Sequence, residues 1–137
     1  MKASEIMTRN VLSARENISV KEAARIMAKN KVGALIIETS KPTAGIWYGI
    51  FTQSDLLTRV VAEGKDLENT KIRDVMTDGI KCAQAEDDVN EIARIMYEEN
   101  VRYLPVIEGR KLIGIISTTD LFKFVFRGAE GYQEEIL

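Results

Sequence analysis

The chain repeats itself, and this internal repeat constrains the fold more than any other feature of the sequence. Methionine-threonine pairs, an Ala-Arg-Ile-Met stretch and an Asp-Leu pair each occur twice, in the same order, with mild substitutions between the copies. A single copy has roughly 60 residues and is only marginally stable alone, so we expect two copies that share a core around a pseudo-two-fold axis. The matched segments are residues 7–8 and 76–77, residues 24–27 and 93–96, and residues 55–56 and 120–121.

Each copy has the pattern of a β-α-β-β-α unit. A helix is predicted after Ser19 and after Asp88, because each capping residue is followed three positions later by glutamate and by apolar residues at helical spacing. Continuous apolar runs typical of buried strands follow, and each run leads to a second strand and a second helix. We therefore expect an α/β (α+β) fold of two pseudo-symmetric motifs packed through their sheets. The expected parts are residues 1–67, residues 68–127 and a C-terminal tail of residues 128–137.

The composition argues against several functions. The chain has no histidine and one cysteine, so it offers no histidine-based nucleophile or metal site and no internal disulfide. Its net charge of -2 gives no broad cationic field for nucleic acid, and no apolar stretch approaches the length of a membrane span. We predict a cytoplasmic protein that is not an enzyme and has no metal, resident cofactor, nucleic-acid partner or membrane contact. A catalyst built from carboxylates or lysines is the least favoured alternative.

Two further motifs complete the repeat. The strand Val101-Arg102-Tyr103-Leu104-Pro105-Val106 precedes a Gly-Ile-x-Ser/Thr-x-Ser/Thr-Asp-Leu segment, which stands at residues 49–56 and again at residues 114–121. With the Met-Thr pairs, this ordered set resembles paired CBS motifs, named for cystathionine β-synthase and together called a Bateman module. The resemblance covers residues 3–127 and is to the stand-alone members.

The resemblance implies a function. Bateman modules are regulatory sensors that bind adenosyl ligands, such as AMP, ADP, ATP or S-adenosylmethionine, in clefts between the two motifs. They commonly form homodimers and modulate a partner protein, which the sequence does not identify. The competing interpretation is a ligand-independent interaction or dimerisation scaffold.

The Ser/Thr-x-x-Asp segments carry the chemistry of this prediction. A carboxylate accepts hydrogen bonds only, so Asp55 or Asp120 could bind both hydroxyls of a ribose. Hydroxyl groups at the strand end could donate to a phosphate near the helix N-terminus. The alternative is that these residues simply cap the helix, and both roles can coexist in one residue.

The resemblance also implies that each cleft takes its aspartate from one motif and its adenine slot from the other. Arg102 could hold a phosphate in the Asp55 cleft, or it could be a solvated strand-edge charge. The first cleft would use Thr8, Leu12, Val32, Gly33, Ser117, Thr119 and Asp120. The second cleft would use Thr52, Ser54, Asp55, Thr77, Lys81, Arg102 and Tyr103.

Two lesser predictions concern packing. Met7, Met27, Met76 and Met96 stand at matched positions and are expected to fill the core. Trp47 and Tyr48 could anchor a partner or pack within a strand.

Overall fold

The chain folds into two compact units that do not coincide with the predicted repeats. The computed structural model describes residues 1–39 and 48–127. Unit 2 is Val11–Ile80, and unit 1 combines Met1–Asn10 with the chain from Lys81 onward. The first ten residues therefore belong with the second copy, and the segment up to Ile80 belongs with the first. The boundaries of the repeats stay a prediction, and the tail of residues 128–137, together with Trp47, lies outside the described residues.

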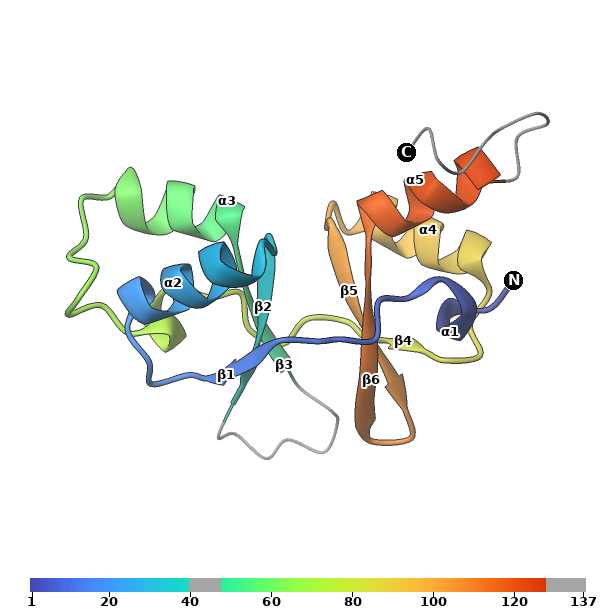
Figure 1. Cartoon of the computed structure of the whole chain (residues 1–137), viewed down its shortest axis with the longest axis horizontal. Helices are drawn as coiled ribbons and strands as arrows, with labels where there is room; N and C mark the ends of the chain where they lie inside the picture. The colour runs from blue at the N-terminus through green and yellow to red at the C-terminus, as the bar shows by residue number, and fades with distance from the viewer. Residues whose placement is uncertain (40–47, 128–137) are drawn as a thin grey trace. The chain divides into compact units, whose positions relative to one another are not determined.

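Unit 2 has the predicted β-α-β-β-α order. Its sheet runs β1-β2-β3, with β1 and β2 parallel and β2 and β3 antiparallel. The two main helical segments lie on the same side of this sheet (Figure 1). The elements are β1 (Ser13–Arg15), α2 (Val20–Asn30), β2 (Ala34–Glu38), β3 (Tyr48–Thr52), α3 (Gln53–Asp55), a π-helical turn η1 (Leu56–Val61) and a 3₁₀ turn η2 (Ile72–Asp74).

Unit 1 repeats this architecture. Its sheet runs β4-β5-β6, again with a parallel and then an antiparallel pair. The predicted hairpin is present, with Gly109 at φ +62° in the turn between β5 and β6. The mixed α/β fold class is thus confirmed in both units. The elements are α1 (Ala3–Ile6), β4 (Ala83–Gln84), α4 (Val89–Glu98), β5 (Tyr103–Glu108), β6 (Lys111–Ser117) and α5 (Thr118–Arg127).

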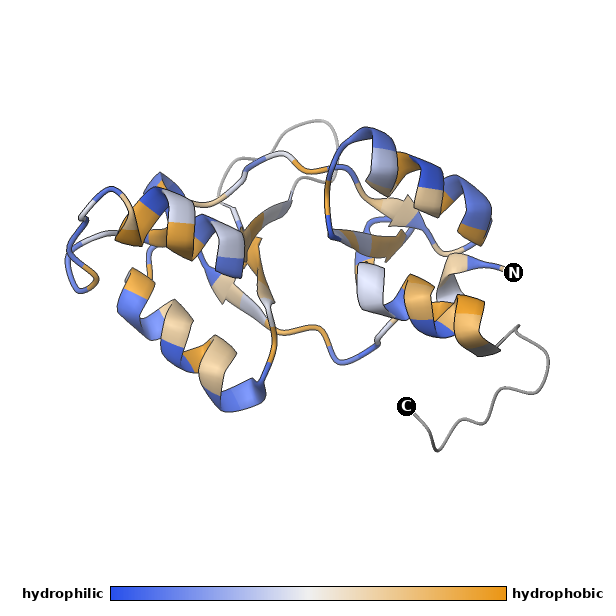
Figure 2. Cartoon of the chain, turned by 90° about the horizontal axis from the view of Figure 1, so that it is seen from above, coloured by the Kyte–Doolittle hydropathy of each residue, from blue (hydrophilic) through white to orange (hydrophobic). Residues whose placement is uncertain are grey.

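The helices after the first strands begin as the sequence predicts, with one difference. The Ser19 hydroxyl accepts a hydrogen bond from the Glu22 backbone N–H at 3.1 Å. The Asp88 carboxylate instead accepts from the Asn90 N–H at 3.0 Å, one residue earlier than predicted. Glu91 is paired with Arg94 one turn further along the helix. Figure 2 shows hydrophobic and hydrophilic residues alternating along these helices, in line with the predicted amphipathic pattern.

Each unit has its own hydrophobic core. Each core includes residues from the segment that contains the Met-Thr pair, which we call the lead segment: residues 3–8 in unit 1 and residues 72–77 in unit 2. In unit 2, Phe51 is fully buried beside Ile72 and Met76. In unit 1, Ile116 is fully buried in a cluster that includes Ala3, with Met7 packed against it. The predicted core role of the methionines is therefore confirmed.

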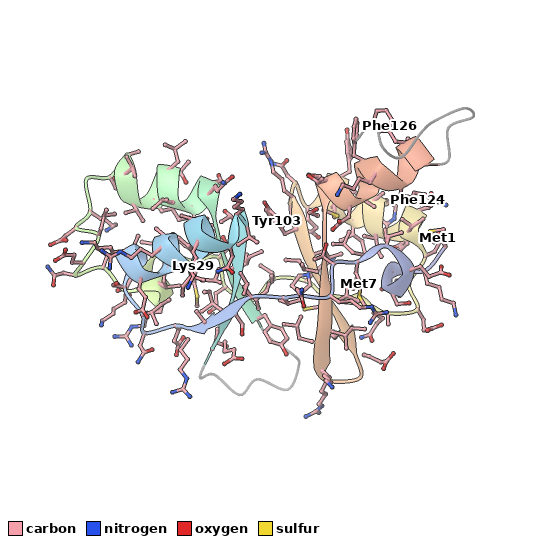
Figure 3. All side chains as sticks on the ribbon, in the orientation of Figure 1. Met1, Met7, Lys29, Tyr103, Phe124 and Phe126 are labelled. Atoms are coloured by element: carbon pink, nitrogen blue, oxygen red, sulfur yellow. The ribbon has the colours of Figure 1, made fainter. Side chains whose placement is uncertain are left out.

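Each lead segment also pairs with the last strand of its unit. Thr8 exchanges two backbone hydrogen bonds with Ile115, of 2.8 and 2.9 Å, and Thr77 does the same with Ile50. The neighbouring strand residues, Gly114 and Gly49, leave room for the sulfur atoms of Met7 and Met76. Met7 lies beside β6 in Figure 3. This pairing covers the edge of each sheet and brings a threonine to the end of the last strand.

Candidate functional site

The two Ser/Thr-x-x-Asp segments form matched corners where the last strand of a unit turns into its second helix. We call Thr52, Asp55 and Thr77 the Asp55 corner, which lies wholly in unit 2. The second set is the Asp120 corner, which lies wholly in unit 1 and consists of Ser117, Asp120 and Thr8.

One carboxylate oxygen of each aspartate is used to cap the helix. At the Asp55 corner, the Thr52 N–H donates to Asp55 Oδ2 at 3.0 Å, and the Asp55 N–H donates back to Thr52 Oγ1 at 3.2 Å. At the Asp120 corner, the corresponding distances between Ser117 and Asp120 are 2.9 and 3.1 Å. The capping interpretation is confirmed, with Thr52 and Ser117 as the N-caps and the aspartates at the third helical position.

The other carboxylate oxygen faces the threonine of the lead segment. Thr8 Oγ1 donates to Asp120 Oδ1 at 3.3 Å, and Thr77 Oγ1 donates to Asp55 Oδ1 at 3.4 Å. Both are long for a hydroxyl–carboxylate hydrogen bond. The structure therefore brings together Thr8 with Asp120 and Thr77 with Asp55, as predicted. At each corner, a weakly held carboxylate oxygen lies beside a hydroxyl group.

The two corners differ four residues beyond the aspartate. Arg59 Nε lies 3.6 Å from Asp55 Oδ1, and Arg59 Nη1 donates to the Met76 carbonyl at 2.8 Å. The matched residue of the second copy is Phe124, on α5 (Figure 3). Asp55 is 7% exposed, whereas Asp120 is half-buried, and among the described residues no cation lies within ion-pair distance of Asp120.

Sequence reasoning missed Arg59. The i,i+4 spacing of Asp55 and Arg59 on a helix was the available signal. The alignment of the two copies emphasises positions that agree, and this position differs between them.

The predicted phosphate-binding hydroxyls fall into two groups. Thr52 Oγ1 and Ser117 Oγ donate to their own aspartates, at 3.2 and 3.1 Å. Ser54 and Thr119 are exposed on the first turn of the helix. The second group is therefore the more accessible to a ligand.

The remaining predicted residues are distributed over both units. Leu12 and Val32 pack against the core of unit 2, and the Gly33 carbonyl accepts from the Gln53 N–H at 3.0 Å. The composite clefts that would join these residues to Asp120 stay a prediction. In unit 1, Lys81 pairs with Glu99 at 2.9 Å.

Arg102 and Tyr103 lie near the Asp120 corner of their own unit. The Arg102 carbonyl accepts from the Thr118 N–H at 3.0 Å, and Tyr103 is the cross-strand neighbour of Ser117. The Arg102 side chain is exposed and lines a shallow groove between α4 and α5, which the sequence did not predict. The other lining residues are Ala93, Met96, Tyr97, Asn100, Val101, Thr118 and Leu121.

Neither metal nor thiol chemistry is indicated in the described part of the chain. Residues 1–39 and 48–127 contain no cluster of three or more acidic or cysteine side chains that could hold a metal ion. Burial raises the pKa of the Cys82 thiol to about 11, so this thiol stays protonated and unreactive at neutral pH. In the same described ranges, no helix has both the length and the apolar character needed to cross a bilayer.

Comparison with known proteins identifies the family. The CBS domain model matches residues 3–62 and again residues 72–127. The chain therefore belongs to the CBS-domain family, as a tandem pair of CBS domains, and the predicted resemblance is confirmed.

The relatives of this chain differ in length. An uncharacterized protein of Methanopyrus kandleri is 28% identical over 120 residues, which cover 87% of this chain and 60% of that protein. The chain spans 60%, 34% and 52% of the length of three curated relatives that it matches.

Two solved structures share the fold closely. A hexameric CBS-CP12 protein from bloom-forming cyanobacteria superposes with a TM-score of 0.84 and 31% identity, covering 99% of this chain and 76% of that one. CBS domain protein PAE2072 from Pyrobaculum aerophilum, solved as a complex with AMP, gives a TM-score of 0.77 and 25% identity. That match covers 88% of this chain and 90% of PAE2072.

Proposed function

We propose that this tandem CBS protein is a regulatory module that binds an adenosyl ligand and modulates a partner protein. The observation that carries the proposal is the arrangement of Asp120. Its Oδ2 caps α5, the Thr8 hydroxyl lies 3.3 Å from Oδ1 and 3.4 Å from Oδ2, and the side chain is partly exposed. Among the described residues, Thr8 is the only hydrogen-bond partner of Oδ1. A ribose has two adjacent hydroxyl donors, and such an oxygen can accept from them.

The relatives support this choice of ligand class. PAE2072, which shares the fold and 25% of the sequence, was solved with AMP. The protein is a sensor rather than a catalyst in this proposal, because Asp55 and Asp120 each use one carboxylate oxygen to cap a helix and the Cys82 thiol is protonated at neutral pH. A sequence with a single cysteine fits the reducing cytoplasm, which we keep as the proposed location.

A thermal melt with candidate ligands tests the proposal. AMP, ADP, ATP, S-adenosylmethionine and NAD are added in turn to the full chain. A ligand at about 100 times its dissociation constant adds about 2.7 kcal/mol to the free energy of unfolding. For a chain of this size, the expected rise in Tm is on the order of 8–15 °C. An unchanged Tm with all of these ligands would contradict the proposal.

An interaction scaffold is the second candidate, and one observation favours it. Apolar side chains are exposed at matched positions on the last helix of each unit: Leu57 is 62% exposed and Phe122 is 60% exposed. Val61 and Val125 are exposed beside them. Such residues commonly mark a protein interface. A second copy of the chain is the proposed occupant, in keeping with the hexameric assembly of the CBS-CP12 protein.

Light scattering during size-exclusion chromatography tests the scaffold candidate. We expect the wild-type chain to elute as an oligomer and Phe122→Ser to shift it toward the monomer. Thr58→Ser, at an exposed position of the matched helix, is the control. A monomeric wild-type protein would contradict self-association.

A further inference from the structure

The geometry points to a division of labour between the two corners: Asp120 accepts the ligand's sugar hydroxyls, and Asp55 is withheld from ligand by Arg59. This inference rests on the proposed function, because it assigns the proposed ligand to one of two matched carboxylates. One difference between the corners is a helix position that holds Arg59 in one copy and Phe124 in the other.

At the Asp55 corner, both carboxylate oxygens are engaged by protein groups. Oδ2 accepts from the Thr52 N–H and hydroxyl, at 3.0 and 3.2 Å. Oδ1 has Thr77 Oγ1 at 3.4 Å and the Arg59 guanidinium at 3.6 Å. The carboxylate is also buried, at 7% exposure for the residue. A sugar hydroxyl would have to displace a cation from this oxygen, and a neutral donor competes poorly with a charged one.

Arg59 is held in place by more than the carboxylate. Its Nη1 donates to the Met76 carbonyl at 2.8 Å and lies 3.5 Å from the Val75 carbonyl. The guanidinium therefore links the second helix of unit 2 to the end of the lead segment. The helix widens into the π-helical turn η1 directly after Asp55, where the Ala62 N–H bonds to the Leu57 carbonyl at 2.9 Å. We read Arg59 as a brace for this corner.

At the Asp120 corner, the brace is replaced by an apolar ring. Phe124 cannot donate to a carboxylate or to a carbonyl, so within residues 1–39 and 48–127 the long hydrogen bond from Thr8 is the only one that Asp120 Oδ1 accepts. The corner also has an aromatic neighbour, because Tyr103 lies opposite Ser117 in the β5–β6 ladder. The matched pair in unit 2 is Ala34 opposite Thr52. A flat base can stack on tyrosine but not on alanine.

Amide NMR of the full chain titrated with AMP tests the assignment. We expect the amide resonances of Thr8 and Ser117 to shift as AMP is added. The amide resonances of Thr52 and Thr77 should stay unchanged. Asp120→Asn removes one charged acceptor and should weaken AMP binding by about tenfold to a hundredfold. Asp74→Asn removes the same charge at an exposed site outside both corners and should leave AMP binding unchanged.

The role of Arg59 has its own test. In Arg59→Gln the brace is lost, so the Thr52 and Thr77 amides should begin to respond to AMP. If the amide resonances of Thr52 and Thr77 in Arg59→Gln stay unchanged on addition of AMP, the role given to Arg59 is overturned.

The failure of this inference is distinguishable from the failure of the proposed function. If wild-type AMP shifts appear at Thr52 and Thr77, or if Asp120→Asn binds AMP as tightly as Asp74→Asn, the division of labour is overturned while ligand binding stands. If none of AMP, ADP, ATP, S-adenosylmethionine and NAD shifts any amide, the proposed function and this inference are both overturned.

Discussion

The Asp55 and Asp120 corners have the same cap but different surroundings. In both, a threonine or serine ends the last strand, and its N–H and hydroxyl are bound to the same carboxylate oxygen. The cap is thus a property of the motif and fixes the start of the helix. The second oxygen has different surroundings: Asp55 is buried with Arg59 Nε 3.6 Å from its Oδ1, whereas Asp120 is half-buried and has Phe124 at the matched position. One repeated motif therefore yields one braced carboxylate and one accessible carboxylate.

The contact between Arg59 and Asp55 predicts the largest difference in stability, which is between the variants Asp55→Ala and Asp120→Ala. Asp55→Ala removes the cap and also takes the carboxylate away from Thr77 and from Arg59, although Arg59 is half exposed and keeps its bond to the Met76 carbonyl. We expect it to lower the free energy of unfolding by about 3 kcal/mol, against about 1 kcal/mol for Asp120→Ala. Urea unfolding measures both. Asp74→Ala, at an exposed position, is the control and should cost less than about 0.5 kcal/mol. Equal losses in the free energy of unfolding for Asp55→Ala and Asp120→Ala would contradict a stabilising role of Arg59.

The packing of the lead segments gives a smaller contrast. A Cβ on Gly114 would overlap Met7 Sδ and lie 3.0 Å from the Thr8 carbonyl oxygen. A Cβ on Gly49 would lie 2.8 Å from Met76 Sδ and 3.4 Å from the Thr77 carbonyl oxygen. Because a side chain yields more easily than a backbone, we expect Gly114→Ala to cost about 2 kcal/mol and Gly49→Ala about 1 kcal/mol. Chemical denaturation checks the order, and the reverse order would contradict it.

The helix caps of the two units differ in their response to acid. A hydrogen bond from the Asn90 N–H holds the pKa of Asp88 below its ordinary value, whereas Ser19 at the matched position does not titrate. A depressed folded-state pKa means that the cap stabilises α4 above the unfolded pKa and is lost as pH falls through the folded value. We expect the hydrogen-exchange protection factors of α4, which correct for the intrinsic pH dependence of exchange, to fall between about pH 6 and about pH 3 more than those of α2. Asp88→Ser should reduce this difference, and equal responses in the wild type would contradict it.

At alkaline pH the smallest contrast concerns Cys82, whose counterpart in the first copy is Ser13. Burial raises the pKa of Cys82 from 9.0 to about 11. The folded state therefore holds the thiol proton longer than the unfolded state, and stability falls as pH rises between these two values. Thermal melts at about pH 8 and about pH 10 should show a decline that Cys82→Ser reduces. A decline of the same size in Cys82→Ser would show that other groups cause it.

Much of the fold follows from local sequence signals. The capping residue Ser19, the apolar strands and the turn at Gly109 are each specified by neighbouring residues, and each was predicted. The exchange of the lead segments is implied by the family resemblance, which groups Thr8 with Asp120. The repeat pattern alone does not say whether Met7 packs with its own copy or with the other. The structure places it with Gly114 of the second copy.

The candidate site was also predicted only in part from the sequence. The aspartates and their threonines were predicted because the motif occurs twice. The choice between capping and ligand binding was left open. The structure shows the capping role, in which one carboxylate oxygen of each aspartate accepts from the backbone N–H of Thr52 or Ser117, and ligand binding by the other oxygen stays a proposal. Arg59 was missed because its effect depends on three-dimensional contacts with Asp55 and with the Met76 carbonyl.

A crystal structure of the full chain with AMP tests the central claim most directly. The account predicts a ribose hydroxyl within hydrogen-bond distance of Asp120 Oδ1, while Asp120 Oδ2 keeps its bond from the Ser117 N–H. AMP bound away from both corners, or a ribose held by Asp55 alone with Arg59 still in place, would contradict it.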